Sequence, residues 1–188
     1  MTNRFSLIST FILLSAVLLL IGCAPSAADY YNRGLTAYNN GNYDEALEDF
    51  SQVVSLDPNN AQSHYYLGLT LEQIYAQANP ELAINIYTKA ISLDPYFTEA
   101  YYHRGLTCYT LYNQLLAIES LMVQNEEATR NETPLPMLDS NFSLAPHFTS
   151  AECKNMAISD FQMCLSLNIS AEIRQSAETY LQELTNTP

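Results

Sequence analysis

The sequence predicts an all-α protein: a short solenoid of about three helix–turn–helix units that ends in one further helix. The first observation is a glycine in an Arg/Leu-Gly-Leu context at positions 34, 68 and 105, with spacings of 34 and 37 residues. The second is an apolar ladder at i, i+4 and i+7 downstream of each glycine, which is one face of a helix. The third is a Ser-Leu-Asp/Asn sequence that ends each ladder. In the first two units a proline, which cannot continue a helix, follows it.

The first two units share one spacing. Their ladders are Ala46, Phe50 and Val53, and Ala83, Tyr87 and Ala90. In both, the closing aspartate lies 11 residues after the ladder alanine. Gly41 predicts the turn between the two helices of the first unit, because a turn needs a residue that tolerates positive φ. Asn79 followed by Pro80 predicts the start of the second helix of the second unit.

The third unit offers two placements for its second helix. A placement that starts the ladder at Ala117 puts polar Gln124 at the third ladder position. A placement that starts at Ala157 keeps an apolar ladder through Phe161 and Cys164. We prefer the second placement, which implies an insertion of about 40 residues between the two helices.

The insertion spans about residues 113–150 and changes character along its length. Residues 113–130 contain neither glycine nor proline and are expected to be helical, continuous with the helix before them. Residues 131–149 contain three prolines and six large apolar side chains, so we expect an irregular segment that packs against the solenoid. Two roles stay open for that segment: covering the partner-binding face, or covering an otherwise exposed edge.

This pattern resembles the tetratricopeptide repeat (TPR). That family places small residues where its two helices approach closely, an aromatic residue in the second helix, and a closing proline. In the first unit these places hold Gly34, Ala46, Phe50, Val53 and Pro58. The sequence departs from the family pattern at the tryptophan of the first helix, which is replaced in the three units by Tyr30, His64 and Tyr101. The resemblance implies a right-handed solenoid with units at 28–60, 61–97 and 98–169, and a C-terminal capping helix and tail at 170–188.

The N-terminal segment is typical of a targeting sequence. Arg4 precedes an apolar run that ends in Leu-Ile-Gly-Cys23, which resembles a bacterial lipobox. The resemblance implies a signal peptide at 1–22, lipidation (palmitate included) of Cys23, and a short tether at 23–27. The protein would then be anchored to a membrane of the cell envelope on its extracytoplasmic side, the outer membrane if the organism has two. An uncleaved anchor and ordinary secretion are the alternatives, and both export the domain.

Composition narrows the classes of partner and chemistry. With 7 basic and 20 acidic residues, the net charge is −13, which opposes binding to nucleic acid. The acidity favours a basic or apolar partner, or serves solubility alone. Cys108, Cys153 and Cys164 are expected as buried thiols, with a disulfide left open. No Cys-x-x-Cys, metal-ligand cluster or phosphate loop occurs, so we expect neither a cofactor nor an enzyme.

The resemblance also implies a concave face lined by the first helix of each unit. The residues three before, one after and four after each glycine would form it: Tyr31, Leu35, Tyr38, Tyr65, Leu69, Glu72, Tyr102, Leu106 and Tyr109. Tyrosine offers a large contact area at low rotamer entropy, so this face is a candidate peptide-binding groove. The alternative is that helix packing or the insertion already covers these rings.

Some members of the family bind acidic C-terminal tails through a clamp of Lys, Arg and Asn. Here the matching places hold Tyr31, Leu35, Tyr66, Glu99 and His103, so an acidic tail is not the expected ligand. His103 is expected to approach Glu99, one helical turn away. We predict a lipid-anchored scaffold or adaptor that binds a protein or peptide partner. The alternative is a structural or self-associating envelope subunit that uses the insertion and edge.

Overall fold

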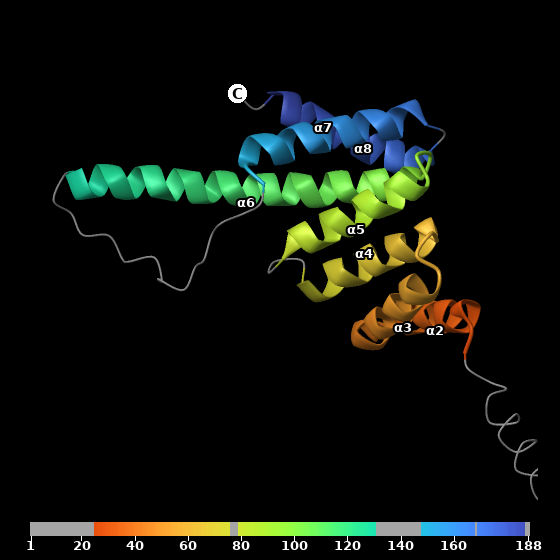
Figure 1. Ribbon diagram of the computed structural model, residues 1–188. Helices are drawn as coiled ribbons and strands as arrows, with labels where there is room; N and C mark the ends of the chain where they lie inside the picture. Colours follow the sequence, from red (N-terminus) through yellow and green to blue (C-terminus); the bar gives the residue numbers. More distant parts are fainter. Residues whose placement is uncertain (1–24, 76–78, 131–147, 168, 187–188) are drawn as a thin grey trace, which may run out of the picture.

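The structure is a computed structural model that describes residues 25–75, 79–130, 148–167 and 169–186, with the side chains of 125–130 outside the description. Within these ranges the protein is all-helical (Figure 1). The helices are α2 (Ala27–Asn39), α3 (Tyr43–Leu56), α4 (Ala61–Tyr75), α5 (Pro80–Leu93), α6 (Thr98–Arg130), α7 (Ser150–Ser166) and α8 (Ala171–Asn186).

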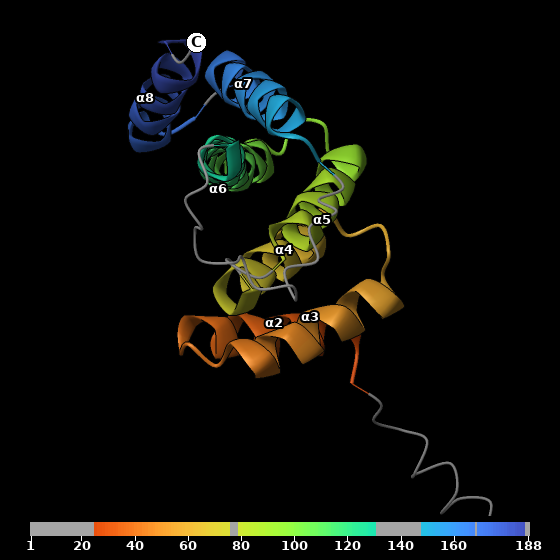
Figure 2. The ribbon, with the colours of Figure 1, turned by 90° about the vertical axis from the view of Figure 1, so that its left-hand side faces the viewer.

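The helices pack in consecutive pairs. α2 packs against α3, α4 against α5, and α6 against α7, and successive pairs stack through α3–α4 and α5–α6 contacts (Figure 2). α8 lies against α7 and also contacts α6. This arrangement confirms the predicted solenoid of three units with a capping helix.

Helix ends follow local hydrogen-bonding chemistry. Ser26 and Asp29 form a capping box at the start of α2, and Thr149 and Glu152 form one at the start of α7. Asn79 accepts a hydrogen bond from the N–H of Leu82 at the start of α5, with proline at the first helical position, as predicted. Gly41 turns the chain between α2 and α3 with φ of 78°.

Helix α6 shows how the third unit accommodates its insertion. It continues for 33 residues, about 50 Å, well past the point where its partner α7 begins (Figure 1). The helical part of the insertion is therefore an extension of the first helix of the unit. Phe148, near the end of the predicted irregular segment, packs against the core of the third unit. Residues 131–147 lie outside the described residues, so the predicted packing of the rest of that segment stays a prediction.

The ladder residues form the core. Ala157, Phe161 and Cys164 are each 0% exposed, which confirms the second of the two placements for the third unit. The glycines permit the close approach of paired helices: a Cβ on Gly34 would lie 3.1 Å from the Phe50 ring. The three cysteines of the described residues are buried as free thiols, and no disulfide joins them.

Helix α8 closes the solenoid as the first helix of a further unit would. The ring of Tyr180 in α8 stacks on Phe161 of the third unit, with centroids 5.5 Å apart. In the same way, Tyr66 of α4 stacks on Phe50 of the first unit, also at 5.5 Å. Ala177 and Leu184 are buried, whereas its outward face is exposed and polar. A cap of this kind prevents the last unit from exposing its core. None of the described helices is long and apolar enough to cross a bilayer.

Candidate partner-binding face

The nine predicted residues lie on α2, α4 and α6, the first helices of the three units. In each unit the tyrosine three residues before the glycine packs its ring against the aromatic residue of its own ladder. The pairs are Tyr31–Phe50, Tyr65–Tyr87 and Tyr102–Phe161, with centroids 6.0, 6.1 and 6.3 Å apart. These tyrosines are half-buried, so each ring lies partly in the core and partly at the surface.

The residues four after each glycine form the seams between neighbouring units. Tyr38 packs edge-on against Tyr66 of the second unit, with centroids 6.2 Å apart. Tyr109 packs against Tyr180 of α8 at 4.9 Å, and its hydroxyl hydrogen-bonds to the carboxylate of Glu183. The face is therefore a packing seam as well as a surface.

The leucines one after each glycine differ in exposure. Leu35 and Leu106 are half-buried, whereas Leu69 is 8% exposed and belongs to the core. Leu69 thus offers little surface to a partner, and the accessible leucine contact comes from the two outer units.

The seam between α4 and α6 is polar. One carboxylate oxygen of Glu72 accepts a hydrogen bond from the hydroxyl of Thr107, and the other lies 3.5 Å from Nδ1 of His103. The predicted approach of His103 to Glu99 is wrong, since the carboxylate that lies within 4 Å of the His103 ring nitrogen is that of Glu72, from another helix. Neither His103 Nδ1 nor the hydroxyl of Tyr87 makes a hydrogen bond within the described residues.

Burial and the Glu72 carboxylate act together on the surrounding tyrosines. Burial raises the pKa of Tyr87 well above its ordinary value, and the nearby charge of Glu72 raises it further. Burial also raises the pKa of Tyr38 and Tyr65, with smaller contributions from neighbouring groups that include Glu72. Because negative charge near a phenol disfavours the phenolate, all three hydroxyls stay protonated hydrogen-bond donors.

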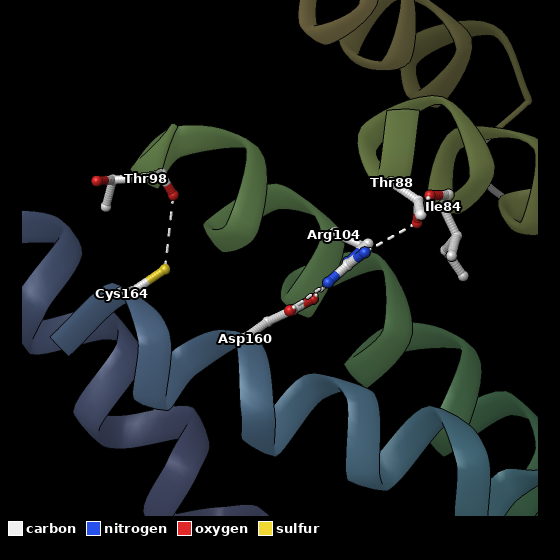
Figure 3. Close-up of polar contacts among 6 residues, drawn as sticks. All are labelled: Ile84, Thr88, Thr98, Arg104, Asp160 and Cys164. Atoms are coloured by element: carbon white, nitrogen blue, oxygen red, sulfur yellow. Dashed lines mark hydrogen bonds and ion pairs between the residues drawn. The ribbon is translucent and has the colours of Figure 1, made fainter. Parts of the chain in front are cut away.

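Two ion pairs, each with a buried aspartate, were not predicted from the sequence. Arg104 of α6 donates two hydrogen bonds to Asp160 of α7, at 2.8 and 2.7 Å, and a third to Thr88 of α5 at 2.9 Å (Figure 3). Arg33 and Asp49 make the same fork in the first unit. The Arg104 guanidinium, held by this carboxylate, has a raised pKa despite its burial.

A sequence signal for these pairs existed. The first helices of units one and three share Tyr-Tyr-x-Arg-Gly-Leu, at 30–35 and 101–106, and the matching second helices share Asp-Phe, at 49–50 and 160–161. In the second unit the same two positions hold Leu67 and Ile86, which pack in one apolar cluster.

The other candidate chemistries find little support. No group of His, Cys, Asp and Glu in the described part of the chain has an arrangement that could hold a metal ion. His64 is buried, with Nε2 3.0 Å from the carbonyl oxygen of Pro58, so it is a packing residue. His147 and Cys23 lie outside the described residues.

Comparison with known proteins agrees with this geometry. Residues 27–60 match the family model described as Tetratricopeptide repeat. No curated protein sequence matches the chain. The fold is similar to the Arabidopsis OM64 TPR domain (TM-score 0.55, 16% identity, covering 84% of this chain and 95% of that one).

Two similar structures contain bound peptides. The first TPR of Spaghetti (RPAP3) bound to an HSP90 peptide has a TM-score of 0.57 and 15% identity, with 86% of this chain and 97% of that one covered. The Yersinia enterocolitica type III secretion chaperone SycD, in complex with a peptide of the translocator YopD, has a TM-score of 0.55 and 14% identity, with 84% and 91% covered. The chain thus carries a tetratricopeptide repeat at residues 27–60 and has the all-helical solenoid fold of TPR domains.

Proposed function

We propose that the protein is a lipid-anchored scaffold or adaptor of the bacterial cell envelope that holds a protein or peptide partner against its tyrosine-lined face. The observation that carries the proposal is the run of half-exposed aromatic and leucine side chains along α2, α4 and α6. Such side chains give large contact area with little loss of rotamer entropy. The peptide complexes of the SycD and RPAP3 structures support this use of the fold.

The chemistry of the face favours a different ligand from that of the RPAP3 structure. That structure holds the peptide SRMEEVD, which is acidic at its C-terminal end. The nine residues of the present face include no lysine or arginine, and their one charged member is Glu72. An acidic tail would therefore meet repulsion rather than ion pairs, because like charges in a partly desolvated groove are costly.

The face can be tested with a substitution that blocks it without removing a core contact. Leu106 is half-buried on the face, so Leu106→Lys places a long cationic chain in the groove. The matched control is Leu56→Lys at the end of α3, where the leucine is 55% exposed. Both variants should keep the helical circular dichroism of the native protein. Partner capture from envelope extracts should fall in Leu106→Lys alone, and equal capture by both variants would contradict the proposal.

The lipid anchor has its own test. The motif that ends at Cys23 motivates it. Cells that express the full chain are fed an alkyne analogue of palmitate, and Cys23→Ala is compared with the native sequence. The native protein should carry the label and sediment with membranes, and the variant should do neither. Label on both, or on neither, would leave an uncleaved anchor or ordinary secretion as the explanation.

A second function rests on the extension of α6. Its side chains Leu121, Met122 and Val123 are 50, 53 and 55% exposed, an unusual density of apolar surface. A structural subunit that self-associates or joins an envelope complex through this helix would use them. Sedimentation of Leu121→Glu/Val123→Glu against the native protein distinguishes the two functions. A native oligomer that this variant dissociates, with partner capture unaffected by Leu106→Lys, would favour the structural role.

A further inference from the structure

The second seam of the solenoid differs chemically from the other two. The first and third seams pair tyrosine with tyrosine, Tyr38 with Tyr66 and Tyr109 with Tyr180. At the second seam the equivalent position holds Glu72, which faces His103. Since the neighbouring seams close with aromatic rings, stacking of the units does not itself require a carboxylate here.

The hydrogen-bonding groups at this seam are incompletely satisfied. The side chain of Tyr87 is 0% exposed, and its hydroxyl interacts with the Glu72 carboxylate without making a hydrogen bond of ordinary length to any described residue. His103 Nδ1 also lacks one, and the Glu72 oxygen beside it is 3.5 Å away, beyond an ordinary hydrogen bond. Unpartnered buried polar groups are destabilising, so their gathering around one carboxylate indicates a position that a further donor completes.

The charge and the surroundings of this position define the donor. The side chains of Glu72 and His103 are 18% and 27% exposed, so a ligand held on the tyrosine-lined face can contact them. No lysine or arginine of the described residues pairs with Glu72; Arg33 and Arg104 are held by Asp49 and Asp160. The rings of Tyr65 and Tyr87 lie beside the same imidazole, with centroids 5.7 and 6.0 Å from it. A partly buried carboxylate flanked by aromatic rings suits an organic cation.

We propose that Glu72, with Tyr87 and His103, is the position at which the partner inserts a cationic side chain, lysine or arginine. This inference rests on the proposed function, because it specifies the chemistry of the peptide that the tyrosine-lined face holds. The ammonium or guanidinium donates to the Glu72 oxygen that lies beside His103, and the Tyr87 hydroxyl and the imidazole complete its surroundings. The alternative occupant of the position is an ordered water molecule.

The experiment uses small probes with the full-length protein in detergent. Nα-acetyl-lysine-N-methylamide is titrated against Nα-acetyl-norleucine-N-methylamide, its uncharged counterpart, and ring resonances of His103 are followed by NMR. The resonances of His64, which is buried and bonded to Pro58, serve as the internal reference. We expect a saturable His103 shift with the lysine probe and an apparent Kd at least about tenfold lower than for norleucine, as a charge-assisted hydrogen bond predicts.

Variants separate the cation site from its surroundings. Glu72→Gln keeps the shape and an acceptor for Thr107 but removes the charge, and it should abolish the preference for lysine. Tyr87→Phe should weaken lysine binding by a smaller factor. Glu48→Gln, an exposed acidic residue of α3, is the matched control and should leave binding unchanged.

The outcomes are decisive for the site alone. A lysine preference that survives Glu72→Gln, equal shifts with both probes, or no shift at all would overturn the proposal, and the last result would indicate a water-filled structural cluster. These results differ from failure of the groove itself. If Leu106→Lys abolishes partner capture but the native protein shows no preference for the lysine probe, the tyrosine-lined face binds its partner without a cation site.

Discussion

The ion pair between Arg104 and Asp160 provides a quantitative test of how the units are held together. The Asp160 side chain is 1% exposed and that of Arg104 is 14% exposed, so Asp160→Ala would leave a guanidinium in the core without its carboxylate. Loss of one partner of a buried ion pair typically costs about 3–5 kcal/mol. For a domain of ordinary stability, about 5–15 kcal/mol, this is a large fraction of the total. At about 2–4 °C per kcal/mol, the melting temperature should fall by roughly 10 °C.

The first unit supplies the matched control. Asp49 makes the same fork with Arg33, but the arginine side chain there is 53% exposed and returns to water when its partner is removed. Asp49→Ala should therefore destabilise the protein less than Asp160→Ala. Urea unfolding followed by circular dichroism measures both variants.

The second unit supplies the rescue. Its equivalent positions hold Leu67 and Ile86, so Arg104→Leu/Asp160→Ile copies a combination that this fold already accommodates. Replacing both members of a buried ion pair with apolar residues is often neutral or stabilising. The double variant should recover most of the loss. The reasoning fails if the two aspartate variants are equally destabilised, or if the double variant is no more stable than Asp160→Ala.

Three further predictions concern the packing, the cysteines and the helix caps. Gly68→Ala should cost about 1–3 kcal/mol in urea unfolding, because its Cβ would lie 2.5 Å from the Tyr87 ring, whereas Gly34→Ala, at 3.1 Å from its nearest ring atom, should be close to neutral. In a Cys23→Ser variant, the three buried thiols should resist a disulfide reagent at about pH 8 and react only after denaturation. Burial protects them and raises the pKa of two of them to about 11 and about 12. Hydrogen bonds at the caps lower the pKa of Asp29 and Glu152 below their ordinary 3.8 and 4.5. A carboxylate whose pKa is lower in the folded state stabilises the protein above its unfolded-state pKa, and this stability is lost as the pH falls through its folded-state pKa. The melting temperature should therefore drop below about pH 4. The drop should be less steep in Thr149→Ala, which lacks the side-chain hydrogen bond to Glu152.

The frame of the fold was predictable because each unit repeats fixed distances from one glycine. Those distances located the helices of the first two units and placed the second helix of the third at Ala157 rather than Ala117. The length of α6 followed from the lack of glycine and proline before residue 130. These are local signals, which act within one helix or between adjacent helices.

The contacts between units were less accessible to sequence reasoning. An i, i+4 count paired His103 with Glu99, but the structure pairs it with Glu72, 31 residues away on another helix. The face of a helix can be read from its period, whereas the side chain across a seam depends on how two helices are rotated and shifted against each other. The Arg104–Asp160 pair has the same character, because 56 residues separate its members and the insertion hides their equivalence to Arg33 and Asp49.

The second unit differs from the first and third units in three features of its packing. It lacks the ion pair, carries Tyr87 where the other ladders have phenylalanine, and closes its seam with Glu72 and His103 instead of two tyrosines. Phenylalanine, which the neighbouring ladders use at the position of Tyr87, has no hydroxyl to leave unpaired. A sequence that keeps a less satisfied arrangement between two better ones indicates a requirement other than stability. If the proposed cation site is correct, the outer units would supply the apolar contact with the partner, and the second seam would supply the chemistry that distinguishes one partner from another.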